Sequence, residues 1–421
     1  MTGMAEFVVV GASLAGAKAV ETLRAEGFAG KITLIGAETD RPYERPPLSK
    51  GYLQGSQARD KAFVHEPGWY RDHEVDLILG LPVTALDAHG HTVTVDRVDK
   101  ISYDKLLLAT GSRVRQLDLP GTDNTGLRYL RTLADADALR SALRPGANVV
   151  VVGGGWIGLE VAAAAVGHGC SVNLVARDAA PPLARVLGPE VGQIFQALHE
   201  ANGVRVWRGV EVREFGGLSG QLTHVVLDDN TELPADVAVI GVGIEPNVDL
   251  AASAGLMIDN GIVTDASLRT SDPDIYAAGD VASSLHPLLG KRIRVEHWAN
   301  ALNGGPAAAR AMLGRDVSYD RLPYFFSDQY DLGMEYAGYV EPGGYDRVVF
   351  RGDVAAREFL AFWTREGRVL AGMNVNVWDV QDDIQKLVRA GYGGRPADLD
   401  RLADPAVPLP EVLTPDRGDA S

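Results

Sequence analysis

The 421-residue chain contains a single cysteine, Cys170, and no CxxC motif. An intrachain disulfide needs two thiols, so dithiol–disulfide redox chemistry within one chain is excluded. Cys170 stands at the start of a predicted buried strand, and we expect it to be a small core residue. The nine histidines lack the spacing of a metal site, so we expect no metal.

Positive charge is also scarce, with 40 Lys and Arg against 56 Asp and Glu. The net charge of −16 disfavours nucleic acid and anionic membrane as partners. The only membrane-like run, 147–168, is interrupted by glycines and by Glu160, so no spanning helix is expected. "MTGMAE" leads directly into a strand pattern, so we expect no signal peptide and a cytoplasmic location.

Glycine is abundant, and two stretches place it between an apolar strand and a helix. They are "FVVVGASLAGAKAVETLRAEGFAGKITLIGAE" (7–38) and "VVVVGGGWIGLEVAAAAVGHGCSVNLVARD" (149–178). Strand, glycine loop, helix and second strand occur in order in both. This order is typical of dinucleotide-binding units, in which the loop brings backbone N–H groups to a pyrophosphate.

The two loops differ in how closely they follow the glycine pattern. The second has all three glycines, Gly153, Gly155 and Gly158, with Trp156 and Ile157 inside it. In the first loop, Gly11 and Gly16 fit, but Ser13 replaces the middle glycine, and its side chain must turn away from the phosphate or bond to it. Glu38 follows the second strand, where a ribose-binding carboxylate is expected.

Two loops predict two dinucleotides, FAD and NAD(P)H, and hence a flavoprotein reductase. "LLLATGS", with Thr110 and Gly111, and "IYAAGD" support this interpretation. Asp280 ends the second motif directly after a strand and a glycine, placed to bond a ribityl hydroxyl. The other interpretation is that Asp280 caps a helix over "VASS", and both roles can coexist.

The order of elements predicts an α/β protein with two Rossmann-like domains and a C-terminal α+β domain containing an antiparallel sheet. We expect a helix over 128–145 between the two units. The predicted domains are a discontinuous FAD-binding domain (1–113 and 243–320), an NAD(P)H-binding domain (114–242) and a C-terminal interface domain (321–421).

Beyond these loops, the chain resembles the ferredoxin reductases that serve bacterial cytochromes P450 and ring-hydroxylating dioxygenases. The resemblance covers nearly the whole chain. The segments that carry it are "PPLSK" (46–50), "LRYLRTL" (127–133), "GGGWIGLEVAA" (153–163), "GIEPN" (243–247), "TSDPDIYAAGD" (270–280), "NAL" (300–302) and "SDQYDLG" (327–333).

The resemblance implies specific cofactor contacts. Arg45 is expected near the flavin and its phosphates, and Gly243 opens the "GIEPN" loop. Trp156 matches an aromatic that covers the flavin until nicotinamide enters. The implied FAD contacts are Ala15, Lys50, Val83, Arg131, Asp280 and Trp298.

Lys50 and Glu160 are implied to meet beside the reactive edge of the flavin. A cation there would stabilise charge that develops on reduction, and a carboxylate beside it would keep the lysine ionised. The alternative is a structural salt bridge between domains.

The implied function is transfer of electrons from NAD(P)H through FAD to a [2Fe–2S] ferredoxin, by a monomer or weak homodimer. Alternatives are a rubredoxin reductase or an NAD(P)H oxidase of the same fold, and a flavin-bearing interaction protein resembling apoptosis-inducing factor. Because such ferredoxins are acidic, an acidic reductase needs a local basic face. Candidate residues are Lys291, Arg292, Arg294, Arg310, Lys386 and Arg389.

The nicotinamide preference depends on the end of the second strand, where a carboxylate usually selects NADH. Here Ala176 takes that place, followed by Arg177 and Asp178. Either Asp178 restores the preference for NADH, or Arg177 binds the 2′-phosphate of NADPH. We expect NADH to be favoured, with weak discrimination.

Overall fold

The structure, a computed structural model, describes residues 4–97 and 100–413, which form two compact units. The first comprises Met1–Arg45, Arg59–Arg113 and Ile244–Pro323. The second comprises Pro46–Ala58, Val114–Gly243 and Tyr324–Ser421. Strands β8 (Ser112–Val114) and β17 (Ile244–Pro246) lie near two of the crossings between units.

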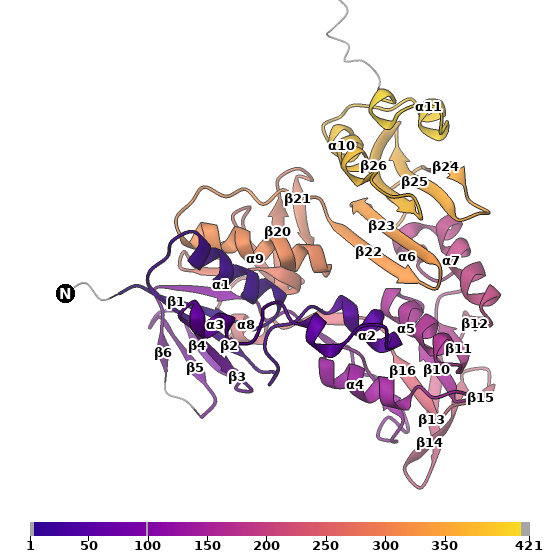
Figure 1. The fold of residues 1–421 in the computed structure, drawn as a ribbon, viewed down its shortest axis with the longest axis horizontal. Helices are drawn as coiled ribbons and strands as arrows, with labels where there is room; N and C mark the ends of the chain where they lie inside the picture. The colour runs from indigo at the N-terminus through magenta and orange to yellow at the C-terminus, as the bar shows by residue number, and fades with distance from the viewer. Residues whose placement is uncertain (1–3, 98–99, 414–421) are drawn as a thin grey trace, which may run out of the picture. The chain divides into compact units, whose positions relative to one another are not determined.

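The first unit is built on a parallel sheet in the order β19-β7-β1-β2-β3. Its strands are short apolar runs, and Val8 and Val9 are fully buried, as expected for a parallel sheet covered on both faces. Helices α1 and α9 pack side by side in this unit (Figure 1). The bounds are β1 Glu6–Val10, α1 Leu14–Ala25, β2 Lys31–Gly36, β3 Val75–Leu79, β7 Lys105–Leu108, β19 Ile275–Ala277 and α9 Trp298–Met312.

Two smaller sheets complete the first unit. They are β4-β5-β6 and β18-β20-β21. Their strands are β4 Val83–Asp87, β5 Thr92–Val95, β6 Ile101–Ser102, β18 Ile262–Thr264, β20 Ala282–His286 and β21 Lys291–Arg294, and the short helices are α3 Trp69–Asp72 and α8 Asp249–Ser253.

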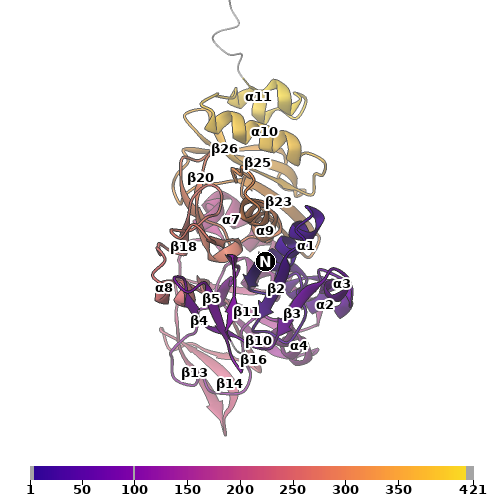
Figure 2. The same ribbon diagram turned by 90° about the vertical axis from the view of Figure 1, so that its left-hand side faces the viewer.

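The second unit contains another parallel sheet, in the order β12-β11-β10-β16-β9. Strands β13 and β14 form a hairpin that projects from it (Figures 1 and 2). The bounds are α2 Gly51–Gln54, β9 Leu127–Arg128, α4 Leu133–Ala142, β10 Asn148–Val152, α5 Trp156–Gly167, β11 Ser171–Ala176, α6 Ala184–Leu187, α7 Pro189–Ala201, β12 Arg205–Arg208, β13 Val212–Leu218, β14 Gln221–Leu227, β15 Glu232–Pro234 and β16 Val237–Ile240.

The second unit also holds the antiparallel C-terminal sheet, β22-β23-β26-β25-β24. Its core contains the fully buried Phe362 and Trp363. Helix α10 buries Ile384, Leu387 and Val388 and packs on β26 and β23, and Figure 2 shows the helix beside β26. The bounds are β22 Tyr324–Gln329, β23 Leu332–Gly338, β24 Arg347–Asp353, β25 Glu358–Arg365, β26 Arg368–Val375, α10 Gln381–Tyr392 and α11 Leu399–Ala403. The predicted fold class is therefore confirmed.

Two local predictions are wrong. The helix expected over 128–145 is α4, which begins only at Leu133. Thr132 and Asp135 form a reciprocal capping box that sets this start, and the preceding residues form β9. Cys170 is half-buried rather than in the core, and its thiol donates to the Arg144 carbonyl oxygen at 3.3 Å. Within 4–97 and 100–413, no helix is long and apolar enough to cross a membrane.

Candidate active site

The glycine loop of the first unit is a sharp turn that only glycine fits. Gly11 adopts φ +118°, and a Cβ there would lie 2.1 Å from the Ala109 carbonyl oxygen. A Cβ at Gly16 would lie 2.1 Å from the Gly11 carbonyl oxygen. Both glycines are therefore required for the close approach of α1 to the sheet.

The start of α1 suits an anionic ligand. Ser13 is the N-cap residue, but its side chain makes no capping hydrogen bond, and the first turn contains no acidic residue. The helix N-terminus therefore presents N–H groups and a hydroxyl without a competing carboxylate. Ser13 in place of glycine is compatible with a bound pyrophosphate.

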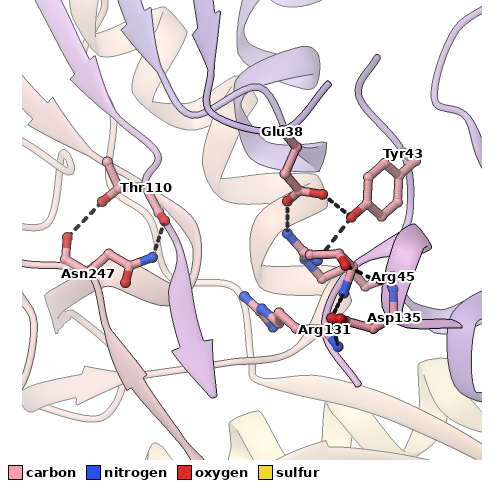
Figure 3. Close-up of polar contacts among 8 residues, drawn as sticks. Glu38, Tyr43, Arg45, Thr110, Arg131, Asp135 and Asn247 are labelled. Carbon is pink, nitrogen blue, oxygen red and sulfur yellow. Dashed lines mark hydrogen bonds and ion pairs between the residues drawn. The ribbon is translucent and has the colours of Figure 1, made fainter. Parts of the chain in front are cut away.

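The carboxylate expected at the ribose is already oriented by its neighbours. Glu38 Oε1 accepts from Arg45 Nη2 at 2.9 Å, and Glu38 Oε2 accepts from the Tyr43 hydroxyl (Figure 3). A carboxylate has about four acceptor sites, so two remain for ribose hydroxyls. The structure therefore brings Glu38 and Arg45 together, and their geometry fits a ribose and a phosphate.

The "ATG" strand end is tied to the loop around Asn247. Thr110 Oγ1 donates to the Asn247 carbonyl oxygen at 2.9 Å, and Asn247 Nδ2 donates to the Thr110 carbonyl oxygen at 2.8 Å (Figure 3). Gly111, with φ +65°, accepts from the Asn247 backbone N–H at 2.9 Å. These three hydrogen bonds fix the backbone at the carboxyl end of β7. Parallel sheets bind ligands at this edge.

Asp280 lies at the same end of the neighbouring strand β19, within the 3₁₀ turn Gly279–Val281. The alternative that it caps a helix over "VASS" is wrong, because the chain continues directly into β20. Gly279, at φ +78°, makes the turn, and a Cβ there would touch the Ala15 Cβ at 3.3 Å. Asp280 and Ala15 thus lie on adjacent parts of one edge.

Trp298 is the first residue of α9 and is half-buried. Burial raises the pKa of Glu44, and the interaction of its carboxyl with Trp298 opposes that rise. Burial also lowers the pKa of His297, the N-cap residue of α9, to about 4. Val83 begins β4, opposite Val95.

The second unit repeats the construction of the first loop. Gly153 also adopts φ +118°, and a Cβ there would lie 2.2 Å from the Gly241 carbonyl oxygen. Gly158 approaches Gly153 as Gly16 approaches Gly11, with 2.1 Å from a built Cβ to the carbonyl oxygen. Gly155 differs, because a Cβ there would meet no atom within 4 Å. The space beside Gly155 is therefore open in the protein itself, and a pyrophosphate could approach the backbone closely at this position.

The aromatic that comes after these glycines is held from two sides. The Trp156 ring lies edge-on to Phe195, with centroids 5.5 Å apart, and to Phe325, with centroids 5.1 Å apart. Ile157 is 44% exposed, an unusual state for isoleucine. Both residues sit in the first turn of α5, which has no acidic residue.

Lys50 and Glu160 form the predicted pair, both within the second unit. Lys50 Nζ donates to Glu160 Oε1 at 2.7 Å, and the side chains are 14% and 3% exposed. The same carboxylate accepts from Ser49 Oγ at 2.5 Å and from Ser327 Oγ at 2.7 Å. Burial raises the pKa of the nearby Asp328, while Lys50 opposes that rise. A buried carboxylate with three donors is well compensated.

The remaining predicted residues, Arg131 and Gly243, belong to the second unit, and each makes a backbone hydrogen bond. Arg131 donates its backbone N–H to Asp135 Oδ2 at 3.0 Å, directly before α4 (Figure 3). Gly243, at φ +105°, accepts from the Arg115 backbone N–H at 3.0 Å. These contacts fix the backbone at both positions.

The residues expected to contact the ribose of NAD(P)H lie at the end of β11. Ala176 is 6% exposed, and its Cβ lies 3.4 Å from a Cβ built on Gly154. Arg177 is exposed, with its Nε 3.9 Å from Glu211 Oε1. In the sheet, Ala176 is paired with Arg208 of β12. Arginine side chains and an acidic neighbour therefore share this edge.

Two glycine loops that match at their first and third glycines, together with a buried lysine–glutamate pair, are typical of an oxidoreductase that uses FAD and NAD(P)H. Comparison with known proteins agrees with this assignment. Residues 5–305 match the pyridine nucleotide-disulphide oxidoreductase family, and residues 324–413 match the reductase C-terminal family.

Full-length relatives narrow the assignment. The chain is 40% identical to the ferredoxin–NAD(+) reductase component of an anthranilate 1,2-dioxygenase system from Burkholderia cepacia, covering 97% of this chain and 99% of the relative. It is 37% identical to putidaredoxin reductase from Pseudomonas putida, covering 98% of each. Among solved structures, the covalent putidaredoxin reductase–putidaredoxin complex matches with a TM-score of 0.92 at 36% identity, covering 98% of each chain. The chain therefore belongs to the pyridine nucleotide-disulphide oxidoreductases, within their group of ferredoxin reductases from oxygenase systems.

Sequence reasoning assigned no role to Ser49 or Ser327, the two hydroxyl donors to Glu160. Both lie inside motifs that carry the family resemblance, "PPLSK" and "SDQYDLG". That location was the only signal, because a serine has no pattern that distinguishes a buried donor from a surface residue.

Proposed function

We propose that this oxidoreductase passes electrons from NAD(P)H, through FAD, to a [2Fe–2S] ferredoxin that supplies a cytochrome P450 or a ring-hydroxylating dioxygenase. FAD, when bound, accepts a hydride from nicotinamide and releases the two electrons singly to a one-electron carrier. The observation that carries the proposal is the pair of glycine loops, both with φ +118° at the first glycine. On the strength of the family resemblance, the first loop is assigned to the retained FAD and the second to the exchanging nicotinamide dinucleotide.

Specific residues of the first unit would hold FAD. Gly11, Ser13 and the start of α1 suit the pyrophosphate, and Glu38 with Arg45 suits the adenosine ribose and a phosphate. The edge formed by Thr110 and by the turn at Asp280 suits the ribityl chain. Val83, Arg131 and Trp298 are further proposed contacts on the strength of the family resemblance.

The Lys50–Glu160 pair is proposed to act at the reactive edge of the flavin. Its lysine brings a fixed positive charge, and Glu160 holds that charge in one place through a 2.7 Å bond. Because both side chains are largely buried, solvent screens the positive charge of Lys50 only weakly. The charge is already in position, so no water has to reorganise when the flavin is reduced. Trp156, in the first turn of α5, would cover the site until nicotinamide enters.

NADH is proposed as the preferred donor, with weak discrimination against NADPH. Glu211, 3.9 Å from Arg177, supplies negative charge at the edge where a 2′-phosphate would sit. Arg177 counters that charge, so the repulsion of a phosphate is smaller than an unpaired carboxylate would provide. Asp178 stands next along the chain and adds to the negative side of the balance.

Candidate docking cations differ in how far their charge is already compensated. Arg310 pairs with Glu26 at 2.5 Å, and Lys386 pairs with Asp383 at 2.9 Å. Arg292 donates to the carbonyl oxygen of Thr264 at 2.7 Å and also to that of Ser283. A docking role for these three residues is therefore weaker than their charge suggests.

The proposed location is the cytoplasm, and the proposed state is a monomer or weak homodimer. The single cysteine suits a reducing compartment. In the described part of the chain, the large exposed apolar side chains are scattered along the sequence, apart from the adjacent Met257 and Ile258, whereas an obligate interface needs a continuous apolar patch. They are Met4, Ile157, Val186, Leu218, Val242, Met257, Ile258, Leu285 and Trp378. Sedimentation velocity over a concentration series measures the oligomeric state.

One experiment tests the function directly. The purified protein should be yellow, with one FAD per chain, and should reduce at least one member of a panel of [2Fe–2S] ferredoxins with NADH. NADPH and a rubredoxin serve as comparisons on the same preparation. Ferredoxin reduction by flavin-free protein, or a flavoprotein that reduces rubredoxin but no ferredoxin, contradicts the proposal.

A further inference from the structure

The motif "SDQYDLG" supplies buried polar groups that the proposed function does not yet use. Ser327 and Gln329 occupy alternate positions of β22, so their side chains lie on the same face of the sheet. Ser327 is 1% exposed and Gln329 is 0% exposed. His199 of α7 is also 0% exposed. Three buried polar side chains in one place require partners.

These side chains form one continuous chain of hydrogen bonds that ends on Glu160. Ser327 Oγ lies 2.7 Å from Glu160 Oε1, and Gln329 Nε2 lies 3.0 Å from Ser327 Oγ. His199 Nε2 lies 2.9 Å from Gln329 Oε1. The Tyr330 hydroxyl lies 3.1 Å from His199 Nδ1 and begins the chain. All of these residues belong to the second unit.

The chain has a defined direction because Glu160 accepts and cannot donate when it is ionised. The Ser327 hydroxyl must then donate to Glu160, and its oxygen accepts from the Gln329 amide. The amide oxygen of Gln329 is therefore turned to His199, which must carry its proton on Nε2. Tyr330 completes the chain by donating to Nδ1. Each group in turn determines the orientation of the next.

The opposite direction would remove a donor from Glu160. With the proton of His199 on Nδ1, the Gln329 amide would turn over and its oxygen would accept from Ser327. The Ser327 hydroxyl would then present only lone pairs to the Glu160 carboxylate. Burial lowers the pKa of His199 and so favours the neutral imidazole. Only a neutral imidazole has two tautomers, and the position of its proton then sets the direction of the hydrogen bonds.

We propose that Tyr330, His199, Gln329 and Ser327 form a positioning relay that holds a hydrogen bond on Glu160 and thereby fixes the orientation of the Lys50 ammonium. This inference rests on the proposed role of Lys50 and Glu160 in hydride transfer. The relay residues are positioning residues, since none of the four forms a hydrogen bond with Lys50, whose bond is to Glu160. Their effect reaches the lysine only through the Glu160 carboxylate.

Two serine variants distinguish the effect of the relay from the effect of any single hydrogen bond to the Glu160 carboxylate. Ser327→Ala removes the relay bond to Oε1, and Ser49→Ala removes an independent bond to Oε2. We expect Ser327→Ala to lower the limiting rate of flavin reduction by NADH about tenfold, with KM for NADH unchanged, since one bond to a buried charge is lost. The assay is anaerobic stopped-flow on FAD-loaded protein, so it does not depend on any ferredoxin.

Double variants test whether the four relay residues act together. Gln329→Met should slow flavin reduction in the native background and in Ser49→Ala. In Ser327→Ala it should have no further effect, because the link to Glu160 is already absent. Tyr330→Phe removes only one hydroxyl at the half-buried end of the chain, and we expect about a twofold slowing. That conservative variant keeps the test available if Gln329→Met does not fold.

A second readout is independent of turnover. ¹⁵N NMR of selectively histidine-labelled protein should show His199 as the neutral Nε2–H tautomer, with Tyr330→Phe raising the Nδ1–H fraction. An Nδ1–H tautomer in the native protein overturns the relay. So do equal effects of Gln329→Met in the Ser327→Ala and Ser49→Ala backgrounds. Loss of ferredoxin reduction with these couplings intact would refute the proposed acceptor and leave the relay standing.

Discussion

Replacement of Lys50 by methionine tests the proposed redox site most directly. Methionine keeps most of the aliphatic length of lysine but removes its charge and its bond to Glu160. The lysine is 14% exposed and the glutamate 3% exposed, so the substitution leaves a buried carboxylate without its counter-ion. The two hydroxyl donors, Ser49 and Ser327, remain.

The magnitude depends on this partial compensation. Removal of one partner of a buried ion pair destabilises a protein by about 3–5 kcal/mol. Because two of the three donors to Glu160 survive, we expect the lower end, about 3 kcal/mol. The effect on flavin reduction is separate: loss of one preorganised charge-stabilising group lowers a rate by about 10²–10³-fold. Retention of FAD should change little, because the residues proposed to bind its phosphates and ribose lie in the other unit.

Three measurements check this prediction on the same preparation. Urea unfolding measures stability, absorbance measures the FAD-to-protein ratio, and anaerobic stopped-flow measures flavin reduction by NADH. Lys61→Met is the control, since Lys61 is exposed and should show none of these effects. A destabilised Lys50→Met protein that reduces its flavin at the native rate would refute the redox role and leave only a structural salt bridge.

Further predictions concern the two dinucleotide units. Ala176→Glu adds a carboxylate beside the expected ribose position and should shift the NADH/NADPH ratio of kcat/KM toward NADH by about 10- to 100-fold. An unchanged ratio would show that the ribose does not bind next to residue 176. Gly155→Ala should preserve Tm, since its Cβ meets no atom within 4 Å, but should weaken NAD⁺ binding in a titration of flavin absorbance. Gly153→Ala should lower Tm strongly, because its Cβ would lie 2.2 Å from a carbonyl oxygen, and equal Tm values for the two variants would contradict this distinction. The pKa of His297 is about 4 in the folded protein, below the ordinary value of 6.5, so the unfolded chain binds the proton more tightly. Stability should therefore fall as pH drops from about 6.5 toward 4, and His297→Asn should flatten that part of the urea-unfolding profile.

Some features could be predicted from sequence because they depend on local backbone geometry. Gly11 and Gly153 adopt a φ that other residues rarely accept, so a glycine between an apolar strand and a helix is a strong local signal. Runs such as "VVVV" favour buried parallel strands for the same local reason. The boundary of α4 was predicted less well, because Thr132 and Asp135 form a capping box inside a segment that otherwise looks helical.

Isolated side chains were harder to place, because burial is a property of the whole fold. Cys170 lies directly before the apolar strand β11, outside the sheet, and is only half-buried. Asp280 was correctly placed after a strand, but the chain beyond it forms β20 and not a helix. The end of one strand does not specify the type of the next element.

The two dinucleotide units could be predicted from the sequence alone, since each is contained in about thirty consecutive residues with a fixed order of strand, loop and helix. The Lys50–Glu160 pair entered only through the family resemblance, and the tertiary structure decided that these side chains meet at 2.7 Å. It also decided that Ser49, Ser327, Gln329 and His199 share one polar network with them. Apart from the bond between Gln329 and Ser327, these hydrogen bonds join residues more than a hundred positions apart. A hydrogen bond between distant side chains leaves no periodic pattern in the sequence. Only the packing of β22 and α7 around α5 brings them within reach.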